Sequence, residues 1–211
     1  MKASSLRLAV QAAVLAVLIP GTGVAGELQD KIDYCKNCHG ASGQGFRGFY
    51  TAPRLAGQQV QYLENQFKAI SEHRRDNPIA KKFMVPVLES VPLGMRPAIA
   101  KHFSELDPRP ADGGPGNLVA AGKKIYEEGI PDENVPACAA CHGPDAKGSD
   151  MVPRLAGQFY PYLVAQLKGW GKGYRSKDPV NVTDDNTMLP IATAMTGEQI
   201  AAVSAYLSYQ R

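Results

Sequence analysis

The strongest constraint on the fold is a duplication inside the chain. The hexapeptide Pro-Arg-Leu-Ala-Gly-Gln occurs unchanged at residues 53–58 and 153–158, and Tyr-Leu, Gln and Lys follow it in the same register in both copies. A Cys-x-x-Cys-His motif precedes each copy, at residues 35–39 and 138–142. The shift between copies is 103 residues at this motif and 100 at the hexapeptide, so the first copy holds three more residues between them. We therefore expect two similar domains that differ in loop length.

Each copy has the residue spacing of an all-α domain. A helix is predicted to lead into each Cys-x-x-Cys-His motif, a second to follow the hexapeptide, and a third to close the copy. In the last of these, Ile200, Val203 and Leu207 share one helical face. Asn77 and Asp178 each precede a proline and are expected to end the second helices. Alternation typical of strands is not convincing anywhere in the chain.

A Pro- and Gly-rich stretch at residues 108–116 separates the two copies and cannot continue a helix. We place the domains at residues 26–107 and 117–211, with this stretch as the linker. In the first domain the closing helix is predicted to start late, because Val-Pro-Leu-Gly occupies residues 91–94, where a helix start would be expected.

Residues 1–25 have the organisation of a secretory signal peptide. Lys2 and Arg7 precede an apolar run at residues 8–19, and small residues end at Ala25. The run is well short of the roughly 20 residues that cross a bilayer as a helix. We expect export to the periplasm with cleavage after Ala25; retention as an uncleaved anchor is the alternative.

The four cysteines, all within the two Cys-x-x-Cys-His motifs, predict the cofactor. Two thiols at this spacing add across the vinyl groups of a haem, and the following histidine then reaches the iron. The sequence therefore predicts two covalently bound haem c groups, one on Cys35 and Cys38 and one on Cys138 and Cys141. Two disulfides or a zinc site are the alternatives for four cysteines in an exported protein. The histidine after both pairs favours haem.

The axial iron ligands are predicted to be a histidine and a methionine in each domain. His39 and His142 come from the motifs, and Met84 and Met188 lie at nearly equal distances beyond them, 45 and 46 residues. A methionine near a haem can also be flexible core filler.

The other candidate ligands fit less well. Met95 and Met195 match less well in their distances from the motif histidines, and we expect Met95 inside the closing helix and Met195 packed near the start of its own. His73 lies in a charged stretch and His102 is next to a phenylalanine, without counterparts in the second copy. We interpret both histidines as surface or core residues.

Charge gives no support to nucleic-acid binding. The formal net charge is +3, from 23 basic and 20 acidic residues, and the basic residues are spread along the chain rather than gathered in a stripe. With 44% hydrophobic residues, the chain has enough apolar side chains for packed cores.

The repeated order of these motifs resembles the dihaem cytochrome c4 family over essentially the whole mature chain. The resemblance implies two class I cytochrome c domains packed together with the haems facing their interface. It also implies a periplasmic electron carrier tied to a quinol-oxidising complex or a terminal oxidase. In similar proteins a proline carbonyl accepts a hydrogen bond from the ligand histidine, a role that falls here to Pro53 and Pro153. The chain departs from the family pattern at residues 91–94 and 195–197.

Histidine and methionine ligation predicts an electron carrier rather than an enzyme. Both axial positions are then filled, so the iron changes oxidation state without binding a small-molecule substrate. The partners would be redox proteins, most directly membrane respiratory complexes. The alternative is a dihaem redox subunit of a periplasmic oxidoreductase. Arg75 and Arg175 fall at matched positions after the second helices, where a guanidinium can bind a haem propionate, although solvated surface arginines are an equal interpretation.

Overall fold

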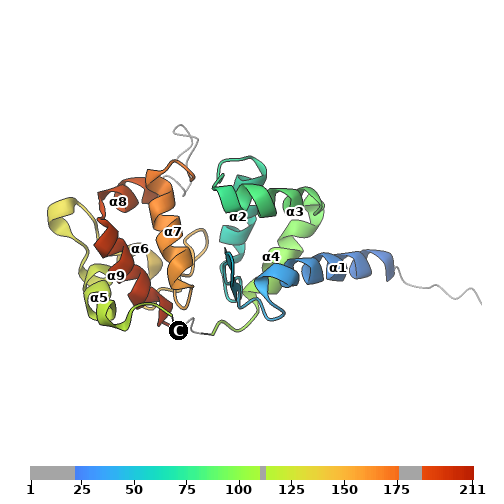
Figure 1. Cartoon of the computed structure of the whole chain (residues 1–211). Coiled ribbons are helices and arrows are strands. Elements are labelled where there is room, and N and C mark those ends of the chain that lie inside the picture. Colours follow the sequence, from blue (N-terminus) through green and yellow to red (C-terminus); the bar gives the residue numbers. More distant parts are fainter. Residues whose placement is uncertain (1–21, 110–112, 176–186) are drawn as a thin grey trace, which may run out of the picture.

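A computed structural model describes residues 22–109, 113–175 and 187–211 (Figure 1). Residues 1–21, most of the predicted signal peptide, lie outside the described residues, as do residues 110–112 of the predicted linker and the Asp178 helix stop. The described chain is mostly helical, which confirms the predicted fold class. None of its helices is long and apolar enough to cross a membrane.

The first half of the chain forms one core. Its elements are α1 (Thr22–His39), β1 (Phe46–Arg47), β2 (Thr51–Ala52), α2 (Val60–Ser71), the π-helical turn η1 (Ala80–Met84), α3 (Val85–Glu89), the 3-10 turn η2 (Leu93–Met95) and α4 (Arg96–Ser104). The faces of α1, α2, α3 and α4 meet in a cluster that includes Ile32, Leu63, Leu88 and Phe103. Aliphatic and aromatic side chains at helical spacing therefore bury this half against itself.

The second half forms a separate core with its own residues. Its elements are η3 (Gly116–Leu118), α5 (Val119–Glu128), η4 (Pro131–Glu133), α6 (Ala139–His142), α7 (Tyr160–Gly171), α8 (Met188–Ala194) and α9 (Gly197–Ser208). Its buried cluster includes Tyr126, Leu163, Val203 and Tyr206 and shares no residue with the first. Figure 1 shows the two halves next to each other, with α2 and α7 facing across the middle.

The halves differ at three places. In the first, α1 runs directly into its Cys-x-x-Cys-His motif, as predicted. In the second, α5 ends at Glu128, and the rest of the motif after Cys138 forms the short α6; the prediction of a helix that leads into this motif is wrong. The reason is local, because Gly129 has φ +75° and two prolines follow before Cys138.

The second and third differences lie in the first half. Two-residue strands β1 and β2 pair antiparallel, with Phe46 opposite Ala52, where the sequence shows no strand alternation. The closing helix α4 starts at Arg96, after Pro92 and a 3-10 turn, which confirms the predicted late start. In the second half, α9 begins at Gly197 behind a capping box between Thr196 and Gln199.

Candidate haem sites

Each Cys-x-x-Cys-His motif ends a helix, and a glycine in the left-handed conformation turns the chain away directly after the histidine. Gly40 has φ +82° and Gly143 has φ +78°. The chain then folds back, so that the amide of Gly45 donates to the carbonyl of His39 at 2.7 Å and that of Gly148 to His142 at 2.9 Å. The two motifs thus have the same backbone frame although the helices before them differ.

The four cysteine thiols are free, and no disulfide joins them. Burial raises the pKa of the Cys35 thiol to about 11, and burial raises that of Cys138 likewise to about 11. Both thiols are therefore protonated at neutral pH. Two unpaired thiols three positions apart with a histidine beside them are the donor set that covalent haem attachment requires.

Both motif histidines are buried and held in one orientation. His39 Nδ1 donates to the carbonyl of Pro53 at 2.8 Å, and His142 Nδ1 donates to that of Pro153 at 3.1 Å. Because a carbonyl only accepts, the proton must sit on Nδ1, which leaves the Nε2 lone pair for a metal. Burial also lowers the pKa of both rings, so they are neutral at physiological pH. These residues fit the proximal ligand of a haem, and the proline role implied by the family resemblance has its geometric basis here.

The candidate methionines both lie next to or within short helices. Met84 is the last residue of η1, directly before α3, and Met188 is the first residue of α8. Each is partly buried, and Met84 packs against the first core. Proline follows two positions later in both cases, at Pro86 and Pro190. The two methionines thus lie in similar but not identical settings, one at the end of a π-helical turn and one at the start of an α-helix.

The competing methionines have other surroundings. Met195 is buried in the second core immediately before α9, where packing was expected. Met95 lies in the η2 turn and not inside the closing helix, because Pro92 and Pro97 delay that helix.

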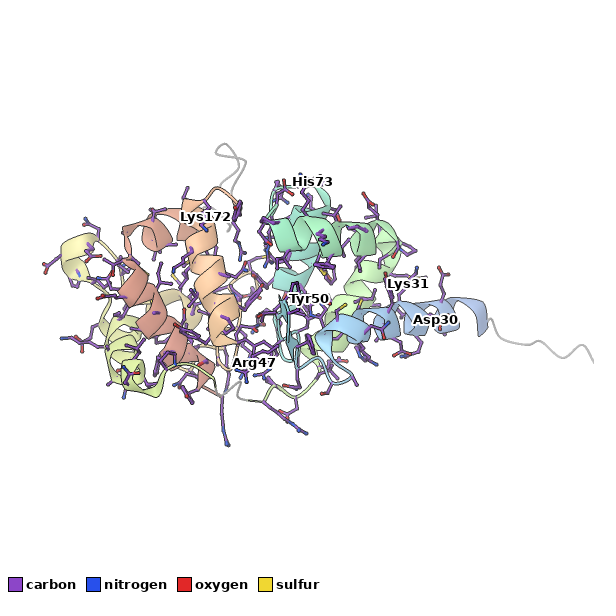
Figure 2. The ribbon with its side chains drawn as sticks, in the orientation of Figure 1. Asp30, Lys31, Arg47, Tyr50, His73 and Lys172 are labelled. Carbon is purple, nitrogen blue, oxygen red and sulfur yellow. The ribbon has the colours of Figure 1, made fainter. Side chains whose placement is uncertain are left out.

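The two further histidines lie elsewhere in the first half. His73 follows α2, is half exposed and lies 3.5 Å from an oxygen of Asp76, and Figure 2 shows it at the edge of the molecule. His102 lies on α4, with its ring edge against Phe103.

A pair of glutamines ties the halves together with two-fold pseudosymmetry. Gln58 Oε1 accepts from the amide of Arg154 at 2.8 Å, and its Nε2 donates to the carbonyl of that residue at 3.0 Å. Gln158 makes the same two contacts to Arg54, both at 3.0 Å. Each glutamine side chain thus forms two hydrogen bonds with the backbone of one residue in the other half, as a neighbouring β-strand would.

This pairing adjoins both candidate haem sites. Arg54 directly follows Pro53, and Arg154 directly follows Pro153. In each half, the proline whose carbonyl orients the motif histidine is therefore directly followed by an arginine. The backbone of that arginine is hydrogen-bonded to the glutamine of the other half.

The arginines predicted as propionate partners lie at the centre of the same interface. Arg75 and Arg175 form an antiparallel bridge and are only 7% and 4% exposed, so they are not solvated surface residues. Gln66 Oε1 accepts from Arg75 Nη1 at 2.7 Å and from Arg175 Nη2 at 3.2 Å, and Gln166 Oε1 accepts from both in the mirrored arrangement at 2.9 and 3.0 Å. Guanidinium groups at this position keep the geometry that a propionate partner needs, which stays a prediction.

The sequence interpretation missed these interface roles. Gln58, Gln66 and Tyr62, with their repeats at Gln158, Gln166 and Tyr162, served only as evidence of duplication. Tyr162 accepts from Arg75 Nη2 at 2.6 Å, and Tyr62 accepts from Arg175 Nη2 at 3.4 Å. The available signal was that polar side chains are identical in both copies alongside core residues such as Leu63 and Leu163, although a core does not require them.

Comparison with known proteins places this arrangement in a family. The cytochrome c family model matches residues 119–210. Cytochrome c4 of Azotobacter vinelandii is 30% identical over 197 residues, which cover 90% of both chains. The chain belongs to the cytochrome c4 family. Membership makes it a cytochrome c4-like electron carrier with covalently bound haem c, and its relatives of that name are not enzymes.

Two further matches extend the comparison. A thiosulfate dehydrogenase electron acceptor from Thiomonas intermedia is 35% identical over 181 residues, covering 83% of this cytochrome c4 homologue and 78% of the relative. The solved structure of Acidithiobacillus ferrooxidans cytochrome c4 superposes with a TM-score of 0.73 at 36% identity, covering 84% of this chain and 99% of that one. The fold and the family thus agree over most of the chain.

Proposed function

We propose that the protein is a periplasmic carrier with two haem c groups, which passes electrons from a membrane quinol-oxidising complex to a terminal oxidase or similar acceptor. The observation that carries this proposal is the repetition of one constellation in both halves. A Cys-x-x-Cys-His motif, a buried histidine fixed by a proline carbonyl and a partly buried methionine 45 or 46 residues beyond the histidine occur in both halves. The domain limits of residues 26–107 and 117–211 and export after Ala25 belong to the same proposal.

Each residue of the constellation has a separate task. Cys35 and Cys38 in one half, and Cys138 and Cys141 in the other, would hold a haem by thioether bonds. His39 and His142 would offer Nε2 to the iron, with the ring orientation set by Pro53 and Pro153.

Met84 and Met188 would supply a thioether sulfur on the opposite haem face. A bound haem c supplies a one-electron ferrous and ferric couple, and a sulfur ligand favours its reduced form. With both axial positions taken by protein groups, no position is left for a substrate.

A second candidate is the electron acceptor of a periplasmic oxidoreductase. The 35% identical relative named as a thiosulfate dehydrogenase electron acceptor favours it. The chemistry within the chain would be the same, because only the donor differs. No cysteine outside the two motifs is available as an axial ligand, so a thiolate-ligated catalytic haem within this chain is not supported.

The test begins with haem content. The chain is produced with a c-type haem maturation system, and intact mass spectrometry is expected to find two covalently attached haems. A Cys138→Ser, Cys141→Ser variant should retain one. A wild-type protein with a single haem or none would contradict the proposal.

The donor is then identified by stopped-flow absorbance. The oxidised protein is mixed either with a reduced quinol-oxidising complex or with thiosulfate dehydrogenase and thiosulfate. Rapid, saturable reduction by the first supports the respiratory carrier, whereas reduction by the second alone supports the alternative. Rapid carbon monoxide binding to most of the reduced haem would reveal an open iron site and overturn the carrier assignment.

A further inference from the structure

Large apolar side chains are exposed mainly on the first half of the molecule. Phe49 is fully exposed, Phe46 is 50% and Phe83 is 37% exposed. The Tyr50 ring stacks on Phe83 at 4.8 Å between centroids and lies 6.3 Å from Phe46, and Phe49 directly precedes Tyr50 in the chain. We call these four residues the aromatic patch. Exposed aromatic clusters are uncommon on a soluble protein and are typical of interaction surfaces.

Most of the aromatic patch lies in a segment that is three residues longer in the first copy than in the second. Seven residues separate Gly45 from Pro53, whereas four separate Gly148 from Pro153, although the backbone frame before and after is shared. The longer segment forms the β1–β2 pair and contributes Phe46, Phe49 and Tyr50. The shorter one, residues 149–152, contains no aromatic side chain. The insertion therefore adds an exposed surface to only one of two otherwise similar domains.

The aromatic patch borders the first candidate haem site. The Tyr50 hydroxyl lies 3.9 Å from Cys38 Sγ, the predicted thioether position, and Phe83 directly precedes Met84. Figure 2 shows Tyr50 and Arg47 close to the strand pair of the first half. A protein seated on the patch would thus lie next to Cys38, one of the two residues predicted to hold the first haem.

Basic side chains surround the aromatic patch. Lys82 Nζ lies 5.4 Å from the centre of the Phe83 ring, and the neighbouring Lys81 is 64% exposed. Arg47 is exposed on β1 and reaches over the ring of Phe159 in the second half. Asp76, which lies 3.7 Å from Lys81, is only 9% exposed and adds little negative charge to the surface. An aromatic centre with a positive rim complements an apolar face that carries carboxylates at its edge.

We propose that the aromatic patch is the docking surface for a redox partner protein with an apolar contact face rimmed by carboxylates, and that electrons cross to or from that partner through the first half. This inference rests on the proposed function, because it requires a haem on Cys38. Aromatic side chains at the centre would supply binding energy, and Lys81 and Lys82 would steer the encounter.

The test uses the two-haem protein with a reduced quinol-oxidising complex and, separately, with thiosulfate dehydrogenase and thiosulfate. Phe49→Ser should lower the second-order electron-transfer rate constant with the true partner by about tenfold, as expected when one exposed aromatic contact is lost. Lys82→Glu should lower the same constant and flatten its dependence on salt. Reduction by a small neutral reductant and the haem content should not change.

Matched controls separate docking from general surface effects. Leu93→Ser removes an apolar side chain that is 75% exposed elsewhere in the first half, and Lys147→Glu reverses a charge in the corresponding loop of the second half. Both should react like the wild type.

Each failure has a separate meaning. A wild type that reacts with neither protein would overturn the proposed function and this inference together. A reactive wild type whose rates are unaffected by Phe49→Ser and Lys82→Glu would overturn the docking surface alone. A wild-type dimer that Phe49→Ser dissociates in sedimentation experiments, with unchanged electron-transfer rates, would assign the patch to a second copy instead.

Discussion

The hydrogen bond from each motif histidine to a proline carbonyl determines which ring nitrogen faces the iron site. In both halves Nδ1 carries the proton, and burial keeps the ring neutral. A histidine without this partner would rotate and change tautomer. After either change, the Nε2 lone pair would no longer point at the iron site. The proline carbonyl thus positions the ligand before the cofactor arrives.

Replacing Met188 with leucine tests the methionine assignment. Leucine keeps the volume but lacks the sulfur donor, so the second haem should lose its long-wavelength methionine-to-iron absorption band, fall in reduction potential and bind added imidazole. The spectrum of the first haem should not change. Absorption spectroscopy of the oxidised protein and an imidazole titration measure these effects.

Met195→Leu is the matched control, because Met195 is buried in the second core. It should reduce stability by less than about 1.5 kcal/mol and leave the spectrum unchanged. If Met195→Leu alters ligation and Met188→Leu does not, the alignment of the copies is wrong, and Met84 must be reassigned with it.

At the residue scale, sequence spacing predicted the chemical groups but not all of their surroundings. The Cys-x-x-Cys-His motifs carry their chemistry within five residues, so no fold was needed to recognise them. The burial of Arg75 and Arg175 depends on contacts between helices about 100 residues apart in the chain. Local pattern contains no signal for such contacts, so a propionate partner and a solvated arginine were indistinguishable in the sequence.

Among the elements, the crossing of α5 and α9 depends on a single glycine. A Cβ on Gly122 would overlap the carbonyl of Ala202 and lie 2.9 Å from Tyr206 Cβ. The backbones therefore approach more closely than any side chain at this position allows, and the crossing brings Tyr126 within 5.5 Å of the Tyr206 ring.

Gly122→Ala is expected to destabilise the second half. The added methyl group meets backbone on α9, which cannot move like a flexible side chain, so we expect a loss of about 2 kcal/mol despite the better helix propensity of alanine. Denaturant unfolding followed by circular dichroism measures the change. Gly116→Ala, where a Cβ meets nothing within 4 Å, should leave the free energy of unfolding nearly unchanged. Equal effects of both substitutions would contradict the close crossing.

Helix positions were predictable where apolar spacing is clear, as for α9. The expected stop at Asn77 was wrong, because α2 already ends at Ser71, six residues earlier. The β1–β2 pair was not predictable, because two-residue strands are too short to show alternation. The break between α5 and α6 was also missed, although Gly129, Pro131 and Pro136 are visible in the sequence. Because the two copies are similar in sequence, the same helix pattern was expected in both, and these helix-breaking residues were given too little weight.

Across the whole molecule, the two buried arginines link the halves electrostatically. A cation near a haem favours the reduced iron, which carries one positive charge fewer. Arg75→Gln should therefore lower the reduction potential of at least one haem, by a free energy on the order of 1 kcal/mol. Spectroelectrochemical titration measures it. Lys172→Gln, at the exposed end of α7, is the control and should have little effect because solvent screens that charge. Unchanged potentials in both Arg75→Gln and Arg175→Gln would contradict the propionate role.

We expect the paired glutamines to couple the two cores into a single unfolding unit. Gln58→Leu and Gln158→Leu would each leave a buried backbone amide and carbonyl of the opposite arginine without its glutamine partner, at about 1–3 kcal/mol per site. Because the two half-cores share no residue, loss of both pairs should let them melt separately. We expect one calorimetric transition in the wild type and two in the double variant. Gln61→Leu, at an exposed glutamine on α2, should keep one transition. A double variant that still melts in one step at the wild-type temperature would show that other contacts, among them the Arg75 and Arg175 cluster, hold the halves together.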